Sequence, residues 1–262
     1  MRLKTICEIA DGLAPFALSR EYCEKYGAHD NSGVQLDCGG EIRRILFSLD
    51  LSSEAVARAK AFGADCVFTH HPAIYRPLYT LEEAGVGKQV LACARAGISI
   101  VSAHLNLDAA EGGIDDCLMR GLGGEAAECV MDSLTGGGYG RISEIAPAGP
   151  EVFLKRIERE FGARRVLFYA GDRRVARVAS FCGAGTDDET VAFAISHGAD
   201  TFVSSDPKHH LIAALAEAGL NVVILTHYAA ENYGFRKFYE KFENEIKETG
   251  IRTEYFSDER FL

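Results

Sequence analysis

The sequence predicts an α/β protein made of two similar α/β halves that arose by internal duplication. Two observations support this prediction: short apolar runs typical of buried strands alternate with helical segments, and the same order of motifs occurs twice along the chain. A chain of 262 residues is long enough for two such halves, each with its own core. We expect them at residues 1–130 and 131–262, with a C-terminal helix able to pack on the first half.

The elements of the first half follow from apolar runs and from helix end signals. Ser52 and Glu54 mark a helix start, and Gly63 and Gly97 are suitable C-terminal glycines. On these signals we expect strands at 44–49, 65–69 and 98–102, and helices at 54–62 and 88–96. Strand-helix-strand alternation of this kind indicates a parallel or mixed sheet with helices on its faces.

An internal repeat is the most informative feature. Residues 56–72 read VARAKAFGADCVFTHHP and residues 191–207 read VAFAISHGADTFVSSDP, identical at seven of seventeen positions without a gap. In both halves an Ala-Gly pair, a strand and a His-x-x-x-acid motif follow. Gly alone recurs at helix-to-strand turns, but that explains only the Gly-Ala-Asp triplet and not two signatures in the same order. The Gly-rich segment 135–140 is the expected linker or loop, and residues 235–248 read as an amphipathic helix.

Composition excludes several classes of function. A formal charge of −10 and a pI near 5.3, without a dense Lys/Arg stripe, argue against a long nucleic-acid partner but not against a single nucleotide. The N-terminus does not read as a secretory signal, and no apolar run is long enough for a membrane span. The eight cysteines are dispersed, with no Cys-x-x-Cys pair, which favours reduced thiols in a cytoplasmic protein over a zinc-thiolate site.

Histidines and acids gather where strands are expected to end. They are His70 and His71, His104 and Asp108, and His227 and Glu231. Binding sites in open α/β sheets form at the carboxyl ends of strands, and a divalent ion stabilises imidazoles and carboxylates held together there. Residues four apart on a helix share a face, so both side chains of a His-x-x-x-acid motif can reach one ion.

Each motif also has a simpler explanation. A single His-x-x-x-acid pair is more often a helical ion pair or cap than a metal site. Adjacent histidines on a strand point to opposite faces, so His70 and His71 converge only if the backbone turns before Pro72. The occurrence of the motif in both halves shifts the balance towards a metal site in the cleft between them, with His70, His71, Asp108, His227 and Glu231 as ligands.

Imidazole and carboxylate ligands without thiolate suit two divalent metal ions such as zinc, iron or manganese. Five ligands leave open positions for water, and a metal pair that activates water implies hydrolysis. His104 is then the expected catalytic acid or base, although it could equally orient a ligand.

The motifs resemble those of the type 2 GTP cyclohydrolase family, the NGG-interacting-factor-like proteins with dinuclear metal centres. The resemblance spans nearly the whole chain and rests on five segments: 31–35, 63–72, 104–108, 205–210 and 227–231. It implies two metals on the five residues named above, in a homohexamer whose metal sites face an internal cavity. Ser205 and Pro207 depart from the family pattern, because a glycine and an apolar residue are usual there.

For function, the resemblance implies opening of the guanine ring of GTP with release of formate. Asp206, Lys208 and Arg76 are candidate substrate contacts, although an exposed lysine or arginine is as often plain surface. Residues 136–138 are three glycines without the following Lys-Ser/Thr of a P-loop. Two alternatives remain: a phosphoesterase that uses the same metals, and a non-catalytic metal-binding or trafficking ring protein.

Overall fold

The protein consists of two compact α/β units, described here from a computed structural model that covers residues 1–85, 87–124, 129–135, 137–171 and 173–262. The first unit comprises residues 1–110 and 235–258, and the second comprises residues 111–234 and 259–262. Among the described residues, no helix is both long and apolar enough to cross a membrane.

The first unit contains a five-stranded sheet in the order β1-β4-β3-β2-β11. Strands β11, β2, β3 and β4 are parallel, and β1 is antiparallel to β4. Its strands are β1 (Gly33–Leu36), β2 (Arg44–Ser48), β3 (Cys66–Thr69), β4 (Ser99–Ser102) and β11 (Arg252–Phe256). Its helices are α1 (Leu3–Leu13), α2 (Phe16–Tyr26), α3 (Ser53–Phe62), α4 (Lys88–Ala96), α5 (Leu105–Ala109) and the later part of α10 (His227–Ile246).

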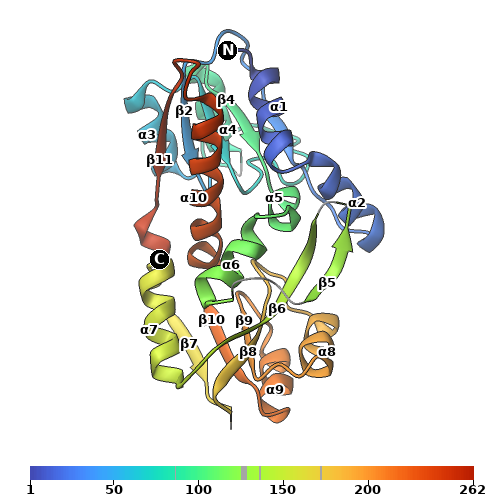
Figure 1. The fold of residues 1–262 in the computed structure, drawn as a ribbon. Helices are drawn as coiled ribbons and strands as arrows, with labels where there is room; N and C mark the ends of the chain where they lie inside the picture. The colour runs from blue at the N-terminus through green and yellow to red at the C-terminus, as the bar shows by residue number, and fades with distance from the viewer. Residues whose placement is uncertain (86, 125–128, 136, 172) are drawn as a thin grey trace. The chain divides into compact units, whose positions relative to one another are not determined.

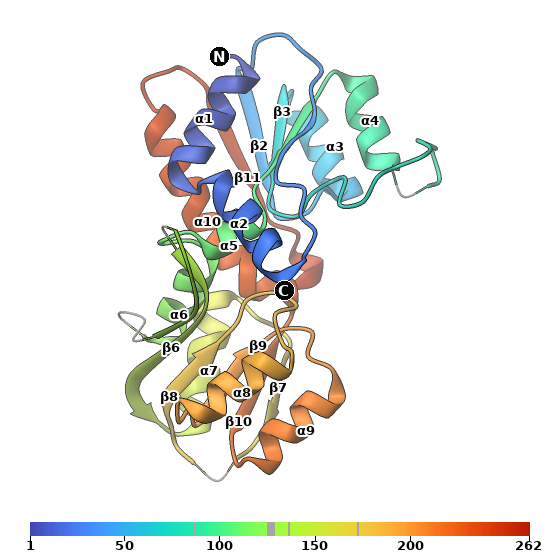
Figure 2. The same cartoon turned by 90° about the vertical axis from the view of Figure 1, so that its right-hand side faces the viewer.

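Alternating side chains of the first sheet pack on two layers of helix. Leu46 and its neighbours on β3 and β4 form a buried cluster with α3 and α4. Phe47 and Phe68 point to the other face, where their rings lie 5.2 and 5.8 Å from that of Phe242 on α10. Figure 2 shows α3 and α4 on one side of this sheet and α1 and α10 on the other. Helix α3 begins where Ser52 accepts a hydrogen bond from the backbone of Ala55, as the sequence predicts.

The second unit contains a six-stranded sheet in the order β5-β6-β8-β9-β10-β7. Strands β8, β9 and β10 are parallel, and the other neighbours pair antiparallel. Its strands are β5 (Cys129–Leu134), β6 (Gly137–Ala148), β7 (Val166–Tyr169), β8 (Val175–Ser180), β9 (Thr201–Ser204) and β10 (Asn221–Leu225). Its helices are α6 (Ile114–Leu122), α7 (Pro150–Phe161), α8 (Asp188–Ser196), α9 (His209–Glu217), the start of α10 and the 3-10 turn η1 (Glu259–Phe261). Figure 1 labels the strands and α-helices of this unit.

The two repeats form equivalent cores. The repeat aligns Cys66 with Thr201, and these residues occupy matching places in the ladders: Cys66 lies opposite Ser99 on β4, and Thr201 lies opposite Asn221 on β10. Strands β2, β3 and β4 with helices α3 and α4 therefore correspond to β8, β9 and β10 with α8 and α9. The predicted α/β architecture with an internal duplication is confirmed.

The aspartate of the repeated Gly-Ala-Asp triplet has the same structural role in both units. Asp65 accepts hydrogen bonds from the backbone N–H groups of Arg43 and Arg44, at 2.8 and 2.9 Å. Asp200 accepts from two consecutive N–H groups near the start of β8, at 3.0 and 2.7 Å. Each carboxylate thus joins the start of one strand to the start of its neighbour, which explains why the triplet persists in both halves.

The boundaries of the units differ from the expected division between residues 130 and 131. Residues 111–130 lie within the second unit, where the carboxylates of Asp115 and Asp116 on α6 bond to Gly140 and Arg141 of β6. The Gly-rich segment 135–140 is expected as a linker or loop, but residues 137–140 begin β6, which pairs with β5. Gly136 lies outside the described residues. Helix α10 begins in the second unit and ends in the first.

Candidate metal centre

Two adjacent histidines follow β3, and the backbone turns there so that their rings lie close together. The N–H groups of His70 and His71 both donate to the carbonyl of Leu49, at 3.1 and 3.0 Å. This shared acceptor ends the regular strand alternation, which would otherwise send the two side chains to opposite faces. The ring centroids are 4.8 Å apart. The two imidazoles can therefore serve one site.

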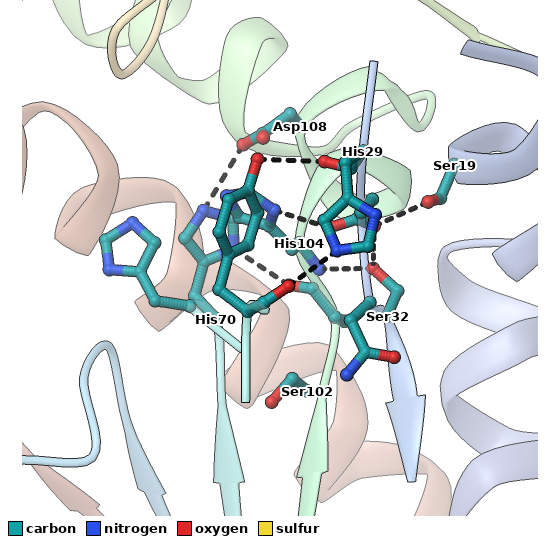
Figure 3. Close-up of polar contacts among 12 residues, drawn as sticks. Ser19, His29, Ser32, His70, Ser102, His104 and Asp108 are labelled. Atoms are coloured by element: carbon teal, nitrogen blue, oxygen red, sulfur yellow. Dashed lines mark hydrogen bonds and ion pairs between the residues drawn. The ribbon is translucent and has the colours of Figure 1, made fainter. Parts of the chain in front are cut away.

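His70 is fully buried beside an acidic side chain. Its Nδ1 lies 2.8 Å from the carbonyl oxygen of Ala103, so this nitrogen carries the hydrogen. Its Nε2 lies 3.4 Å from Oδ1 of Asp108, which is 5% exposed and comes from the short helix α5 (Figure 3). The bond to Ala103 fixes the tautomer in which Nε2 has the lone pair that a metal requires.

His71 and His104 are each oriented by a carboxylate. Nδ1 of His71 lies 2.7 Å from Oδ1 of Asp50, and Nδ1 of His104 lies 2.7 Å from Oδ1 of Asp30. One ring nitrogen from each of His70, His71 and His104 falls within 4.8 Å of the others. Histidines that bind metals characteristically have their second nitrogen held by a carboxylate or carbonyl, as all three have here.

Asp30 lies in a polar network that fixes His104. Its Oδ2 accepts hydrogen bonds from the hydroxyls of Ser19 and Ser32, at 2.5 and 2.6 Å, and the Ser32 hydroxyl also accepts from the backbone N–H of His104 (Figure 3). Burial raises the pKa of Asp30, but the hydrogen bond and charge of His104 and the two serine hydroxyls outweigh burial and hold this pKa well below its usual range. Asp30 is therefore an ionised acceptor for the His104 ring.

The second unit places a histidine and a glutamate one turn apart at the start of α10. Nε2 of His227 lies 3.1 Å from Oε1 of Glu231, whose side chain is 2% exposed. Nδ1 of His227 lies 2.7 Å from Oδ2 of Asp206. The arrangement matches that of the first unit, because one ring nitrogen is held by an oxygen and the other lies near a buried carboxylate.

Asp206 and Lys208 follow β9. Asp206 has φ 48°, a left-handed conformation that is uncommon for residues other than glycine. In this conformation its carboxylate reaches His227. Its observed contact is therefore with a histidine, and its role in substrate binding stays a prediction. Lys208 is the exposed N-cap residue of α9, and Arg76 is exposed after the double histidine. Their predicted contacts with substrate also stay predictions.

The donor sets fit a divalent metal ion. Three imidazoles of the first unit and one of the second have fixed tautomers. In each unit a nearly buried carboxylate lies within 3.4 Å of an imidazole nitrogen. A buried carboxylate and neutral imidazoles are stabilised by a cation, and nitrogen with oxygen donors suits zinc, iron or manganese. The chain thus carries buried His, Asp and Glu groups able to hold a metal ion.

Sequence reasoning did not identify Asp30 and Asp50 as partners of histidines. Asp50 comes two residues after β2, and a polar residue at the end of a strand is a pattern that could have indicated a place in the site. Asp30 precedes an edge strand and lies 74 positions from His104, and nothing in its local pattern indicates this pairing.

The comparison with known proteins identifies the family. A model described as Duf34/NIF3 (NGG1p interacting factor 3) matches residues 1–260. The chain belongs to this family. The predicted resemblance is confirmed, because the relatives of this Duf34/NIF3 protein include those that carry the type 2 GTP cyclohydrolase name.

Two relatives and one solved structure illustrate the match. The Clostridium perfringens protein named GTP cyclohydrolase 1 type 2 homolog is 29% identical over 239 residues, which are 88% of this chain and 87% of that protein. The Helicobacter pylori protein named GTP cyclohydrolase 1 type 2 is 25% identical over 231 residues, covering 87% of this chain and 86% of that protein. A crystal structure of a Bacillus cereus protein related to NIF3 has a TM-score of 0.83 at 18% identity, covers 98% and 97% of the two chains, and shows the shared fold.

Proposed function

We propose that this Duf34/NIF3 protein is a dinuclear-metal-dependent hydrolase that opens the guanine ring of GTP, or of a related nucleotide, and releases formate. The observation that carries the proposal is the state of the three histidines proposed as ligands: His70, His71 and His227 each have Nδ1 held by an oxygen acceptor. Such fixed tautomers are what metal ligation requires. The names of the Clostridium perfringens and Helicobacter pylori relatives support the choice of reaction.

In this proposal five side chains are the metal ligands. His70, His71 and Asp108 come from the first unit and His227 and Glu231 from the second. Two bound divalent ions, zinc, iron or manganese, would supply the Lewis acidity that activates water and polarises the substrate. The protein side chains hold the donors in place, and Asp50 and Asp206 keep two of the imidazoles from rotating.

His104 is the proposed acid and base. Asp30 holds its Nδ1, so Nε2 is the nitrogen that exchanges a proton with water or with the ring nitrogen released from the guanine. The two serines on Asp30 fix the carboxylate, and hence the direction in which the imidazole points. Lys208 and Arg76 are the proposed cationic contacts of the phosphates, and Asp206 is a proposed further substrate contact.

We also propose that the protein acts in the cytoplasm as a homohexamer on a small-molecule substrate, without long nucleic acid or a membrane as partner. The acidic charge of −10 supports the exclusion of nucleic acid. The mass in solution, measured by light scattering, tests the hexamer.

The decisive experiment incubates metal-loaded protein with GTP and measures formate and phosphate separately. Formate release supports the proposed reaction. Phosphate release without formate would instead support a phosphoesterase, and neither product, with readily exchanged metal, would support a binding or trafficking protein. Elemental analysis of protein purified without added metal gives the identity and number of the ions.

The matched variants are Glu231→Gln and Glu217→Gln. Glu231 is buried beside His227, whereas Glu217 is exposed at the end of α9 in the same unit. We expect Glu231→Gln to abolish turnover and leave the fold intact, since Gln keeps the size but not the charge of the side chain. Glu217→Gln should behave like the wild-type protein. Unchanged turnover in the Glu231→Gln protein would overturn the mechanism.

A further inference from the structure

A glycine-containing segment after β8 lies against the His227–Glu231 pair. We call residues 182–186 (CGAGT) the glycine loop; it leads from β8 to α8, whose N-cap residue is Asp187. At Gly183 the backbone has φ 57°, a left-handed conformation that favours glycine. All of these residues belong to the second unit.

The space that a side chain at position 183 would need is taken by the two side chains that the proposed function uses as ligands. A Cβ at this position would lie 2.5 Å from Oε1 of Glu231 and 3.3 Å from Nε2 of His227. Carbon atoms do not approach a carboxylate oxygen so closely, so one group would have to move. The end of the glutamate side chain moves more easily than the backbone, and it would leave the position that it now holds beside His227.

The glycine loop cannot easily withdraw from that pair. The backbone N–H of Cys182 donates to Oδ1 of Asp115 at 2.9 Å, and the same carboxylate accepts from Gly140 through Oδ2 at 2.8 Å. The Tyr139 hydroxyl donates to the carbonyl of Cys182 at 3.2 Å. Asp115 is fully buried, and burial raises its pKa. The loop is thus bonded through Cys182, the residue before Gly183, to α6 and β6.

We propose that Gly183 is a positioning residue for the metal centre: by having no side chain, it keeps Glu231 and His227 in the geometry that binds an ion. This inference rests on the proposed function, because it takes those two residues as ligands. The glycine loop would then shape the metal site as well as connect β8 to α8.

A glycine is also needed wherever φ is positive, so crowding must be separated from backbone strain. Gly198 in the same unit has φ 72°, and an added Cβ there would meet nothing within 4 Å. Gly198→Ala therefore introduces similar backbone strain with no crowding. It is the matched control for Gly183→Ala.

The experiment measures metal affinity in the two alanine variants and in the wild-type protein, without substrate. We expect similar thermal unfolding of the two variants in the metal-free state, and a loss of about tenfold or more in affinity for zinc or cobalt only in Gly183→Ala. The visible spectrum of the cobalt-loaded protein should change in the same variant, because the coordination of the ion changes. Equal affinity in the wild-type and Gly183→Ala proteins would overturn the inference.

A second variant keeps the test sharp if Gly183→Ala folds poorly. Asn adopts the left-handed conformation more readily than Ala but is larger. Because its backbone is less strained, Gly183→Asn should be at least as stable as Gly183→Ala. Because its side chain is larger, it should lose at least as much metal affinity if crowding is the cause. Recovery of wild-type affinity in Gly183→Asn would show that strain alone was responsible, and would overturn the inference.

The outcomes also separate this inference from the proposed function. A wild-type protein that binds no metal would overturn both. Metal binding that Gly183→Ala weakens, in a protein that releases no formate from GTP, would support the inference and overturn the proposed reaction.

Discussion

The two repeated cores have kept their scaffold and changed their strand ends. Asp65 and Asp200 bind the start of the preceding strand in the same way, and the ladders of β3 and β9 share their register. By contrast, the repeat aligns His70 with Ser205 and His71 with Asp206. Residues at the carboxyl end of a strand take little part in holding the sheet together, so they are the positions where two copies of one fold can diverge in chemistry.

Despite this divergence, both units share one arrangement: an aspartate that is hydrogen-bonded to Nδ1 of a histidine. In the first unit His71 is held by Asp50, which follows β2; in the second unit His227 is held by Asp206, which stands where the repeat has His71. An aspartate at the end of a strand orients a histidine in each case, but the strand that supplies it differs. The arrangement of donors is therefore similar, although the positions are not equivalent by descent.

The largest expected effect tests the shared scaffold. Asp200 is nearly buried and accepts from the backbone of β8 and from the Thr201 hydroxyl. Asp200→Ala leaves those donors without their acceptor and should lower the free energy of unfolding by about 3 kcal/mol. Asp65→Ala, in a more exposed place, should lower it by about 1–2 kcal/mol. Urea unfolding measures both.

Asp200→Asn is the control, because one oxygen remains as an acceptor; it should lose less stability than Asp200→Ala. If Asp65→Ala and Asp200→Ala both leave the free energy of unfolding unchanged, the aspartate of the Gly-Ala-Asp triplet does not stabilise the contact between neighbouring strands. The equivalence drawn between the two cores would then rest on strand register alone.

The second prediction concerns the diverged strand ends. Asp50→Asn and Asp206→Asn keep the size of each side chain but remove the charge that holds Nδ1 of the neighbouring histidine. We expect each to weaken metal binding about tenfold, which is about 1.4 kcal/mol. Asn also tolerates the left-handed backbone of residue 206, so stability should change little there. Isothermal titration with zinc gives the affinity, and an effect at only one position would break the comparison between the units.

Most of the scaffold could be predicted from the sequence because local rules determine it. The helix expected at 88–96 is α4, and Gly63 and Gly97 end helices as anticipated. The predicted convergence of His70 and His71 depended on a backbone turn, and the shared bonds to the Leu49 carbonyl provide that turn.

The remainder depends on contacts between distant parts of the chain. Residues 111–130 join the second unit because Asp115 and Asp116 bond to β6, and no periodicity reports such a pairing. The bond of Asp30 to His104 is of the same kind, since the partners are 74 positions apart. The crowding at Gly183 depends on the backbone conformation of the glycine loop, which composition does not specify.

The smallest expected effect is a difference in pH dependence between the units. Burial raises the pKa of Asp116, but the charge and hydrogen bond of Arg141, at 2.7 Å, outweigh it and lower this pKa below the usual 3.8. A lowered pKa in the folded state means that the stabilisation is complete above about pH 4 and is lost as the pH falls below that value. Arg120 acts in the same direction, and Asp115, also near Arg141, has a raised pKa.

Asp116→Asn should therefore flatten the loss of stability below about pH 4, measured by urea unfolding at several pH values. The acid sensitivity that Asp30 gives the first unit should remain, because its pKa is lowered through contacts that the variant does not touch. If Asp116→Asn leaves the whole pH profile unchanged, the ion pair with Arg141 contributes nothing measurable, and the acid response belongs to the first unit. A steeper profile would contradict the sign of the pKa shift itself.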